Sequence, residues 1–468
     1  MHHKYKVLGF KDVTLYTVSA MLFMDQIALA ASLGATSMFW WGYVLIFLFI
    51  PMAMISSELG TTYPKNGGVY QWVRTAFGYR WGARISWLYW ITNATWMPTV
   101  YILFAGMLSE LFFPGLSLWQ QVFIGIALSI FTAIFNIVSL KMGKWLPNLG
   151  AVLKIICVLA IGIAGINYGM ANGFANVLTW ETMVPTSGLE IAALGIMVYG
   201  VMGTELACSS ADEMKNPTRD IPRAILASSL IVAAFNIFGT LGVLAAVPIE
   251  QTEITQIFVH SLYNLYGDTG FGYLFATLIA CFVIFTLFTN MVTWSMGTNR
   301  AAIEAADEGE LPRVFGIVHS KYQTPLGSAL LAAAVSSASL LIYSLMANTA
   351  EDLFWSLMSF SAMIFLMPYV AMVLAFIKLR LTDNTERPFR MPVSNSVAVV
   401  IAGFVVLNII GGIVMFVYIP GEPIDWTFTL QVLGGIASSL IVGELIIRYC
   451  EKKKNTITKH EEALQPSN

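Results

Sequence analysis

The stretch that decides the fold is GIMVYGVMGTELACSSADEMKNPTRDIPRA, residues 195–224. It begins as an apolar helix, loses its hydrophobicity at Gly203, Thr204 and Glu205, and then becomes polar through Ser209, Ser210, Asp212 and Glu213. A charge at the centre of a membrane helix costs at least about 2.5 to 3.5 kcal/mol, so it usually faces a polar cavity and marks a transport or relay site. Glu205 is therefore the first candidate functional residue. The alternative is that Glu205 caps the end of an ordinary helix.

The composition excludes a soluble protein. The chain has 468 residues, of which 57% are hydrophobic and 11% charged, whereas soluble domains average about 25% charged residues. Four cysteines without paired spacing indicate neither a disulfide framework nor a zinc site. Nucleotide-binding and metalloprotease motifs are also missing from the sequence. We therefore expect a multi-pass membrane protein without enzymatic activity, cofactor, metal or nucleic-acid partner.

Hydropathy predicts an all-α protein with twelve transmembrane helices. A span needs about 20 mostly apolar residues. Stretches that meet this requirement lie at 12–35, 38–58, 83–113, 118–139, 147–169, 188–208, 225–247, 270–297, 326–347, 352–379, 396–419 and 427–449.

The charges between these stretches indicate an orientation. Lys and Arg gather in every second loop, whereas the alternate loops contain no basic residue and most of them contain Asp or Glu. Because loops on the cytoplasmic side carry an excess of Lys and Arg, we expect both termini, 1–11 and 450–468, in the cytoplasm of a cell whose plasma or inner membrane holds the protein. The basic loops lie at 65–84, 141–144, 215–223, 300–321 and 378–390.

Two of the predicted spans are interrupted by polar or small residues. The first contains Asp25 and Gln26 in its middle, and the sixth contains Gly200 and Gly203 before Glu205. These spans hold matching positions in two five-helix halves, an arrangement that indicates an inverted-repeat transporter with its site where the broken helices meet. The predicted repeats cover 12–169 and 188–379, and the last two spans cover 396–449.

Three motifs resemble those of the amino acid, polyamine and organocation (APC) transporter superfamily. The most specific is YGVMGTELACSSADEMKNPTRDIPRA at 199–224, which is similar to the sixth helix of that superfamily. ELGTTYPKNGGVYQWVRTAFG at 58–78 and NRAAIEAADEGELP at 299–312 are similar to two of its cytoplasmic loops. The resemblance extends over essentially the whole chain. The aromatic run FWWGYVLIFLFIP at 39–51 looks more like the glutamate/GABA exchanger branch.

The resemblance implies a five-plus-five inverted-repeat, LeuT-like fold and alternating access. It also implies a secondary transporter of amino acids or their amines, working as an exchanger. The alternatives are a proton-coupled amino acid symporter and a channel. The substrate, the proton coupling and the oligomeric state stay open.

The substrate is expected at the two helix breaks. Where the superfamily often has a Gly-Ser-Gly motif in the first helix, this chain reads FMDQIALAA at 23–31. A carboxylate at Asp25, with uncoiled backbone around it, would attract an ammonium and repel a second anion; the alternative is that Asp25 pairs with a polar group of another helix. The resemblance places a gating aromatic at Tyr199. The predicted substrate-binding residues are Asp25, Gln26, Ile27, Tyr199, Gly200 and Gly203.

Coupling and gating are assigned to Glu205, Lys154 and Tyr199. Lys154 lies about eight residues into the fifth span, roughly 12 Å deep. Its side chain either extends back to the interface or, as the resemblance implies, replaces a sodium ion between the first, fifth and eighth helices. It could also relay a proton.

Other polar and aromatic residues of the spans carry weaker signals. Most Trp and Tyr residues, Tyr89 among them, are interpreted as interfacial or packing residues. Asn93, Pro98, Ser356 and Ser359 are possible cavity residues.

Overall fold

The computed structural model describes residues 9–64, 68–138, 145–208 and 214–464. This part of the chain contains helices and no β-strand, which confirms the all-α prediction. The polar residues at 209–213 and the basic loop at 141–144 that the sequence singled out lie outside the described residues.

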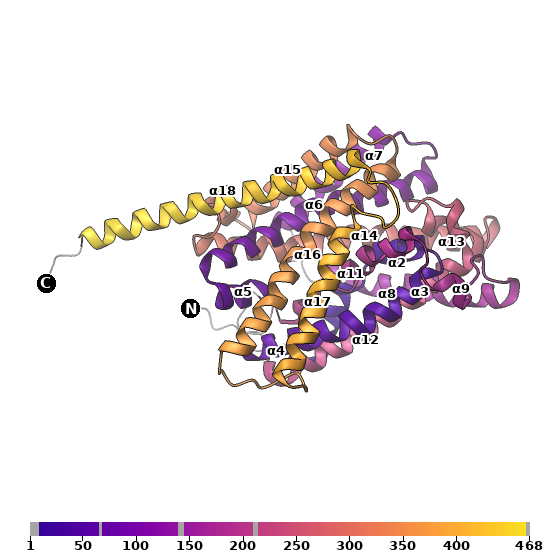
Figure 1. Cartoon of the computed structure of the whole chain (residues 1–468). Coiled ribbons are helices and arrows are strands. Elements are labelled where there is room, and N and C mark those ends of the chain that lie inside the picture. Colours follow the sequence, from indigo (N-terminus) through magenta and orange to yellow (C-terminus); the bar gives the residue numbers. More distant parts are fainter. Residues whose placement is uncertain (1–8, 65–67, 139–144, 209–213, 465–468) are drawn as a thin grey trace.

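Each of the predicted membrane stretches coincides with helix (Figure 1). In chain order the helices are α1 (Phe10–Met21) and α2 (Met24–Ser32), α3 (Thr36–Val44), η1 (Leu45–Phe49) and α4 (Ile50–Thr62), α6 (Tyr79–Phe112), α7 (Leu118–Val138), α8 (Trp145–Asn172), α10 (Gly188–Ala192), α11 (Leu194–Gly200) and η2 (Thr204–Cys208), α12 (Pro217–Ala246), α14 (Gly270–Asp307), α15 (Leu326–Ser344), α16 (Ala350–Thr382), α17 (Asn395–Met415) and α18 (Trp426–Leu464).

Short helices connect or flank the spans. They are α5 (Val69–Phe77), α9 (Trp180–Met183), η4 (Ile249–Gln251), α13 (Ile257–Tyr266) and η5 (Arg313–Gly316). Within the described residues, ten helical stretches are long and apolar enough to cross a membrane, and the bent pair α1–α2 makes an eleventh. Helix α6 covers the remaining predicted span.

The first span breaks at Leu22 and Phe23, where the backbone is extended, and α2 continues at 48° to α1. The uncoiled residues that were expected around Asp25 therefore lie just before it. Asp25 itself occupies the first turn of α2, where a carboxylate is favoured by the partial positive charge of the helix N-terminus. The carboxylate thus marks the start of a helix rather than the break.

The sixth span breaks between Gly200 and Thr204 and resumes as a short 3₁₀ helix. Gly203 makes this possible because its φ is +113°, a conformation that other residues rarely adopt. The second span has a milder irregularity, the π-helical turn η1 ahead of Pro51. Proline clashes with the carbonyl group four residues earlier, and a π turn relieves that clash.

The broken sixth span lies at the centre of the bundle and the last span at its edge. Within the most apolar 18-residue window of each span, 78% is buried in the sixth span and 22% in α18. Figure 1 shows α18 running along one side of the bundle and extending beyond it. In the interior, α6 packs against α14 and α16, and α12 packs against α1 and α8. Side chains from α6, α14 and α16 therefore meet the two helix breaks.

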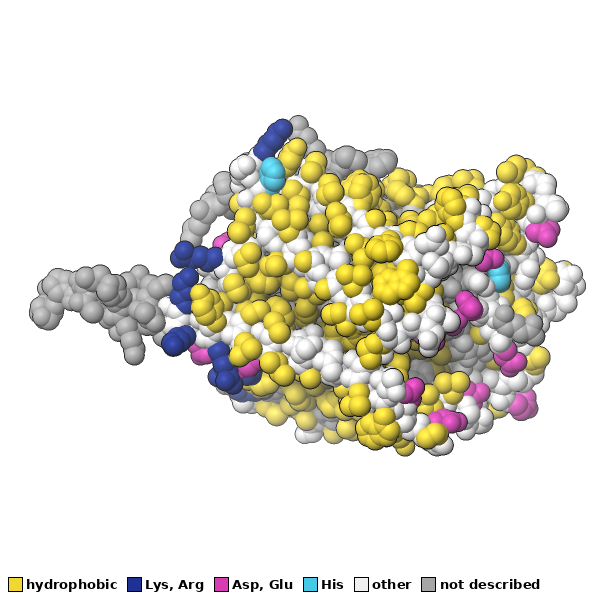
Figure 2. All heavy atoms as spheres, turned by 90° about the horizontal axis from the view of Figure 1, so that it is seen from above, with side chains coloured by type: hydrophobic (Ala, Val, Ile, Leu, Met, Phe, Trp, Pro, Cys, Tyr) yellow, Lys and Arg dark blue, Asp and Glu magenta, His cyan; other side chains and the backbone are white. Residues whose placement is uncertain are grey.

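Charged residues separate to opposite ends of the molecule. Figure 2 shows Lys and Arg mainly at one end, here called the basic end, and Asp and Glu mainly at the other, with a broad hydrophobic surface between them. Large apolar side chains such as Val400 and Leu407 on α17 are strongly exposed. This surface fits the hydrocarbon core of a bilayer.

A buried ion-pair cluster ties α4 to the end of α16 and to the segment that follows it. The side chain of Glu58 is fully buried and accepts hydrogen bonds from Arg380, from Arg387 at 3.0 Å and from the backbone N–H of Met391 at 2.8 Å. Removing one partner of such a cluster leaves an unpaired buried charge.

Candidate functional site

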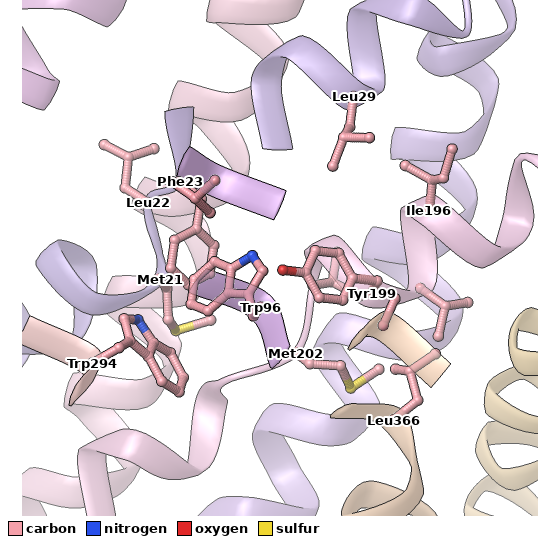
Figure 3. Close-up of a cluster of buried hydrophobic side chains, with 14 of the residues drawn as sticks. Met21, Leu22, Phe23, Leu29, Trp96, Ile196, Tyr199, Met202, Trp294 and Leu366 are labelled. Carbon is pink, nitrogen blue, oxygen red and sulfur yellow. The ribbon is translucent and has the colours of Figure 1, made fainter. Parts of the chain in front are cut away.

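An aromatic cluster fills the space between the two helix breaks. It consists of Phe23 at the first break, Tyr199 on α11, Trp96 on α6 and Trp294 on α14 (Figure 3), together with Phe365 on α16. The ring centroids are 5.1 Å apart for Phe23 and Trp96, 5.6 Å for Trp96 and Trp294, and 5.3 Å for Tyr199 and Phe365. These pairs meet edge to face, a favourable geometry for aromatic rings.

Two adjoining voids lie inside this cluster. Each has a volume of about 10 Å³, room for about one water molecule. They share the walls formed by Thr92, Trp96, Trp294 and Phe365. The first void is completed by Tyr89, Asn93, Pro368 and Tyr369, and the second by Phe23, Tyr199 and Ser361. A ligand larger than water therefore requires the rings to move apart.

Asp25 lies close to Trp96 and Tyr199, two of the residues that line the second void. Its side chain is 2% exposed, and its Oδ1 atom has no hydrogen-bond partner within the described structure. The indole N–H of Trp96 lies near Asp25 and points toward the hydroxyl of Tyr199 (Figure 3). The predicted residues Asp25 and Tyr199 are thus brought together around Trp96.

Lys154 is buried and lies between the first, fifth and eighth spans. Its Nζ atom donates to the carbonyl oxygen of Ser19 on α1 at 3.0 Å and to Oδ1 of Asn290 on α14 at 2.6 Å. It also lies 5.8 Å from the ring centre of Phe23 and attracts Asp25 electrostatically. These contacts rule out extension of the side chain to the interface. The role of the ammonium as a substitute for sodium stays a prediction.

Glu205 lies at the other end of the aromatic cluster, in η2. Its Oε1 atom accepts hydrogen bonds from the hydroxyls of Tyr89 at 2.9 Å and Tyr369 at 2.8 Å. Its Oε2 atom is buried and, within the described structure, without a partner. Both tyrosines also line the first void. Glu205, Tyr89 and Tyr369 form a polar layer, here called the Glu205 layer, that joins α6, η2 and α16.

A larger cavity lies on the other side of the Glu205 layer. Its volume is about 310 Å³. Glu205, Tyr89 and Trp294 belong to its lining, as do Tyr70 of α5 and residues 300–308 near the end of α14. Both of these segments belong to regions that the sequence assigned to basic loops. Tyr89 and Trp294 line both this cavity and the first void, so the Glu205 layer, together with Trp294, stands between them.

The remaining predicted residues shape the helix breaks rather than the voids. Gln26 packs directly against Gly200, where a Cβ atom would lie 2.0 Å from its Nε2. Ile27 is in contact with Gly239 on α12. Gly203 lies against Met21 at the end of α1. None of these side chains is among the residues that line the two voids.

Sequence reasoning missed most of the site's aromatic residues. Tyr89, interpreted from the sequence as an interfacial or packing residue, donates its hydroxyl to Glu205. A signal was present: Tyr89, Thr92, Asn93 and Trp96 follow one another at the three- and four-residue spacing that places side chains on one helix face. Trp294, Phe365 and Tyr369 carry no comparable local pattern.

Unpaired polar atoms gather around the voids. Native proteins pair most buried polar atoms, and leaving one unpaired costs about 1 to 3 kcal/mol. A ligand that enters the voids can pair those that face it. Within the described residues, Thr92 Oγ1, Asn93 Oδ1 and Trp96 Nε1 belong to residues that line the voids, and Asp25 Oδ1, Gln26 Oε1 and Glu205 Oε2 to residues that follow the two helix breaks.

Comparison with known proteins identifies the family. Residues 8–438 match the family described as "Amino acid permease". The chain is 31% identical over 439 residues to a probable agmatine/putrescine antiporter of Lactococcus lactis subsp. lactis (strain IL1403), and the match covers 93% of each chain. It is 27% identical over 350 residues to the cadaverine/lysine antiporter of Escherichia coli (strain K12), covering 72% of this chain and 75% of that one. A probable polyamine transporter of Arabidopsis thaliana is 23% identical over 354 residues, which cover 74% of this chain and 66% of the relative.

The chain belongs to the amino acid permease family of the APC superfamily. It is a multi-pass membrane transporter and not an enzyme. The predicted class, a secondary transporter that exchanges amino acids or their amines, is confirmed.

Proposed function

We propose that this chain exchanges cationic diamines, or amines with a guanidinium group, across the membrane. The observation that carries this proposal is the order of groups in the site: a buried carboxylate at Asp25, five aromatic rings, and a second buried carboxylate at Glu205. Carboxylates attract ammonium groups, and aromatic faces attract cations by about 0.5 to 2 kcal/mol. A chain of methylene groups with a cation at each end matches this order.

The names of the relatives support the same class of substrate. Agmatine, putrescine, cadaverine and lysine each carry two nitrogen-containing cationic groups, and they occur in the names of two relatives. A free glutamate would bring two carboxylates toward Asp25 and Glu205. We therefore place this chain with exchangers of cationic amines rather than with glutamate/GABA exchangers.

We assign the following roles to the buried charges. Asp25 binds one ammonium of the substrate at the first helix break. Lys154 holds α1, α8 and α14 together as a fixed cation, so that transport needs no sodium. The Glu205 layer closes the path between the voids and the larger cavity.

We infer that the basic end faces the cytoplasm, since cytoplasmic loops carry the excess of Lys and Arg. Both termini would then be cytoplasmic, in a protein of the plasma or inner membrane, and the cavity of about 310 Å³ would be the cytoplasmic entrance. Motion of the repeats 12–169 and 188–379 against one another would expose the voids to each side in turn.

Counterflow in proteoliposomes tests the proposal. Vesicles loaded with putrescine should take up labelled agmatine or putrescine with saturation, whereas vesicles loaded with glutamate should not. Uptake that needs a pH gradient but no internal amine would support the proton-coupled symporter instead. Flux that rises linearly with concentration would indicate a channel.

A further inference from the structure

Asn93 presents an acceptor atom to the first void. Neither the Glu205 layer nor Asp25 makes a hydrogen bond with this atom. The amino group of Asn93 donates to Oγ of Ser295 at 3.0 Å, and that hydroxyl donates to the sulfur of Met97 at 3.5 Å. Because the methionine sulfur has no proton to give, Ser295 is the donor in this second contact. The chain of donors directs the amino group of Asn93 to Ser295 and leaves Oδ1 as its other hydrogen-bonding atom.

The Oδ1 atom of Asn93 is buried without a partner. The residue is 1% exposed, and no described residue donates to this oxygen. Asn93 lines the first void together with the rings of Trp96 and Trp294. Thr92, the preceding residue, lines both voids and also has an unpaired oxygen. A carbonyl oxygen accepts hydrogen bonds and cannot donate them, so its partner has to bring an N–H or O–H group, as a water molecule in the void or a substrate that displaces it does.

The place of Asn93 differs from that of Asp25. Asp25 lies close to Tyr199, which lines the second void and not the first, whereas Asn93 lines the first and not the second. The two voids adjoin, because they share four wall residues. A linear substrate that occupies both voids therefore has one end near Asp25 and the other end near Asn93.

We propose that Asn93, with Thr92 beside it, forms a subsite for the distal N–H group of the substrate and selects amines with two cationic ends over monoamines. This rests on the proposed function, in which the substrate is a cationic amine. The distal ammonium or guanidinium, attracted by Glu205 to the void that Asn93, Tyr89 and Tyr369 line, donates to Oδ1 of Asn93 while the aromatic rings cover the chain. Ser295 is a positioning residue, since it holds the amide in the orientation that presents the oxygen.

The test compares putrescine with n-butylamine, which has the same carbon chain and one ammonium, as inhibitors of counterflow. A hydrogen bond to a charged group corresponds to about ten-fold or more in affinity. In Asn93→Leu, inhibition by putrescine should weaken about ten-fold or more, and inhibition by n-butylamine should change less than about two-fold. Ser295→Ala should weaken putrescine to a smaller extent, because the amide can then turn.

Thr99→Val is the matched control. Thr99 lies on the same helix and is also buried with an unpaired hydroxyl, but it is not among the residues that line the voids. This variant should leave the ratio of the two inhibition constants unchanged. Asn93→Asp keeps the acceptor, so it should keep the preference for putrescine even if Asn93→Leu does not fold.

Equal weakening of both inhibitors by Asn93→Leu, or unchanged inhibition by putrescine, would overturn the assignment. A loss of the putrescine preference in Asn93→Asp would do the same. Failure of the proposed function looks different: the wild-type protein would then show neither putrescine exchange nor inhibition by either amine.

Discussion

Replacing Tyr369 by phenylalanine removes one of the two hydroxyls that bind Glu205. The hydroxyl of Tyr369 donates to the carboxylate at 2.8 Å, and Tyr89 donates to the same oxygen at 2.9 Å. Together these bonds connect α16 and α6 through η2, between the voids and the larger cavity. We therefore expect Tyr369→Phe to favour opening of the site toward the basic end.

The size of the effect follows from the chemistry of the lost bond. A hydrogen bond to a charged group contributes about 1.5 to 3 kcal/mol. The bond from Tyr89 remains in Tyr369→Phe, so the lower figure applies. Because about 1.4 kcal/mol corresponds to a factor of ten, the ratio of open to closed molecules should rise about ten-fold. The double variant with Tyr89→Phe should open further.

Labelling of a cysteine behind the Glu205 layer measures this opening. Thr92→Cys places a thiol in the wall shared by both voids, in a background without the four native cysteines. A membrane-impermeant thiol reagent, applied from the basic end, should label it about ten times faster when Tyr369→Phe is added.

Tyr343→Phe is the control for this experiment. Tyr343 is also buried, and its hydroxyl donates to a backbone carbonyl of α18 at 3.4 Å, remote from Glu205. It should not change the labelling rate. An unchanged rate in Tyr369→Phe as well would refute the view that the Glu205 layer controls access.

Three further predictions concern the buried charges. Asp25→Asn should weaken competition by putrescine, since a charge pair at about 4 Å contributes roughly 4 kcal/mol at an effective dielectric constant of 20. This figure is an upper bound because Lys154 also attracts Asp25. Strong inhibition by glutamate at neutral pH, unaltered by Asp25→Asn, would show that Asp25 does not discriminate substrates by their charge. Replacing sodium by a large organic cation should leave uptake intact if the ammonium of Lys154 serves as the fixed cation, and strict sodium dependence would contradict that role. Glu58→Gln should lower stability by about 3 kcal/mol, because it leaves the buried Arg380 and the partly buried Arg387 without their carboxylate. Thermal unfolding in detergent measures the loss, and a melting temperature equal to that of the wild type would disprove it.

The bilayer explains why so much of the fold could be predicted from the sequence. Every backbone polar group in the hydrocarbon region must be satisfied within the protein, so runs of apolar residues have to form helices. The same constraint makes exceptions visible: Asp25 and the Gly203 to Glu205 segment stand out because charge and glycine are costly or unusual in such a helix. Both breaks were predicted in this way, although the first lies at Leu22 and Phe23 and not at Asp25 and Gln26, where the sequence placed it.

Tertiary structure decided which aromatic residues belong to the site. Trp96, Trp294 and Phe365 lie on three helices far apart in the sequence, and their identity is equally compatible with an interfacial belt, a packed core or a binding site. The same holds for Tyr369, whose hydroxyl has a role only because Glu205 lies 2.8 Å away. Contacts of this kind depend on how the helices pack, since the local pattern around a residue records the face it occupies and not the residue it meets there.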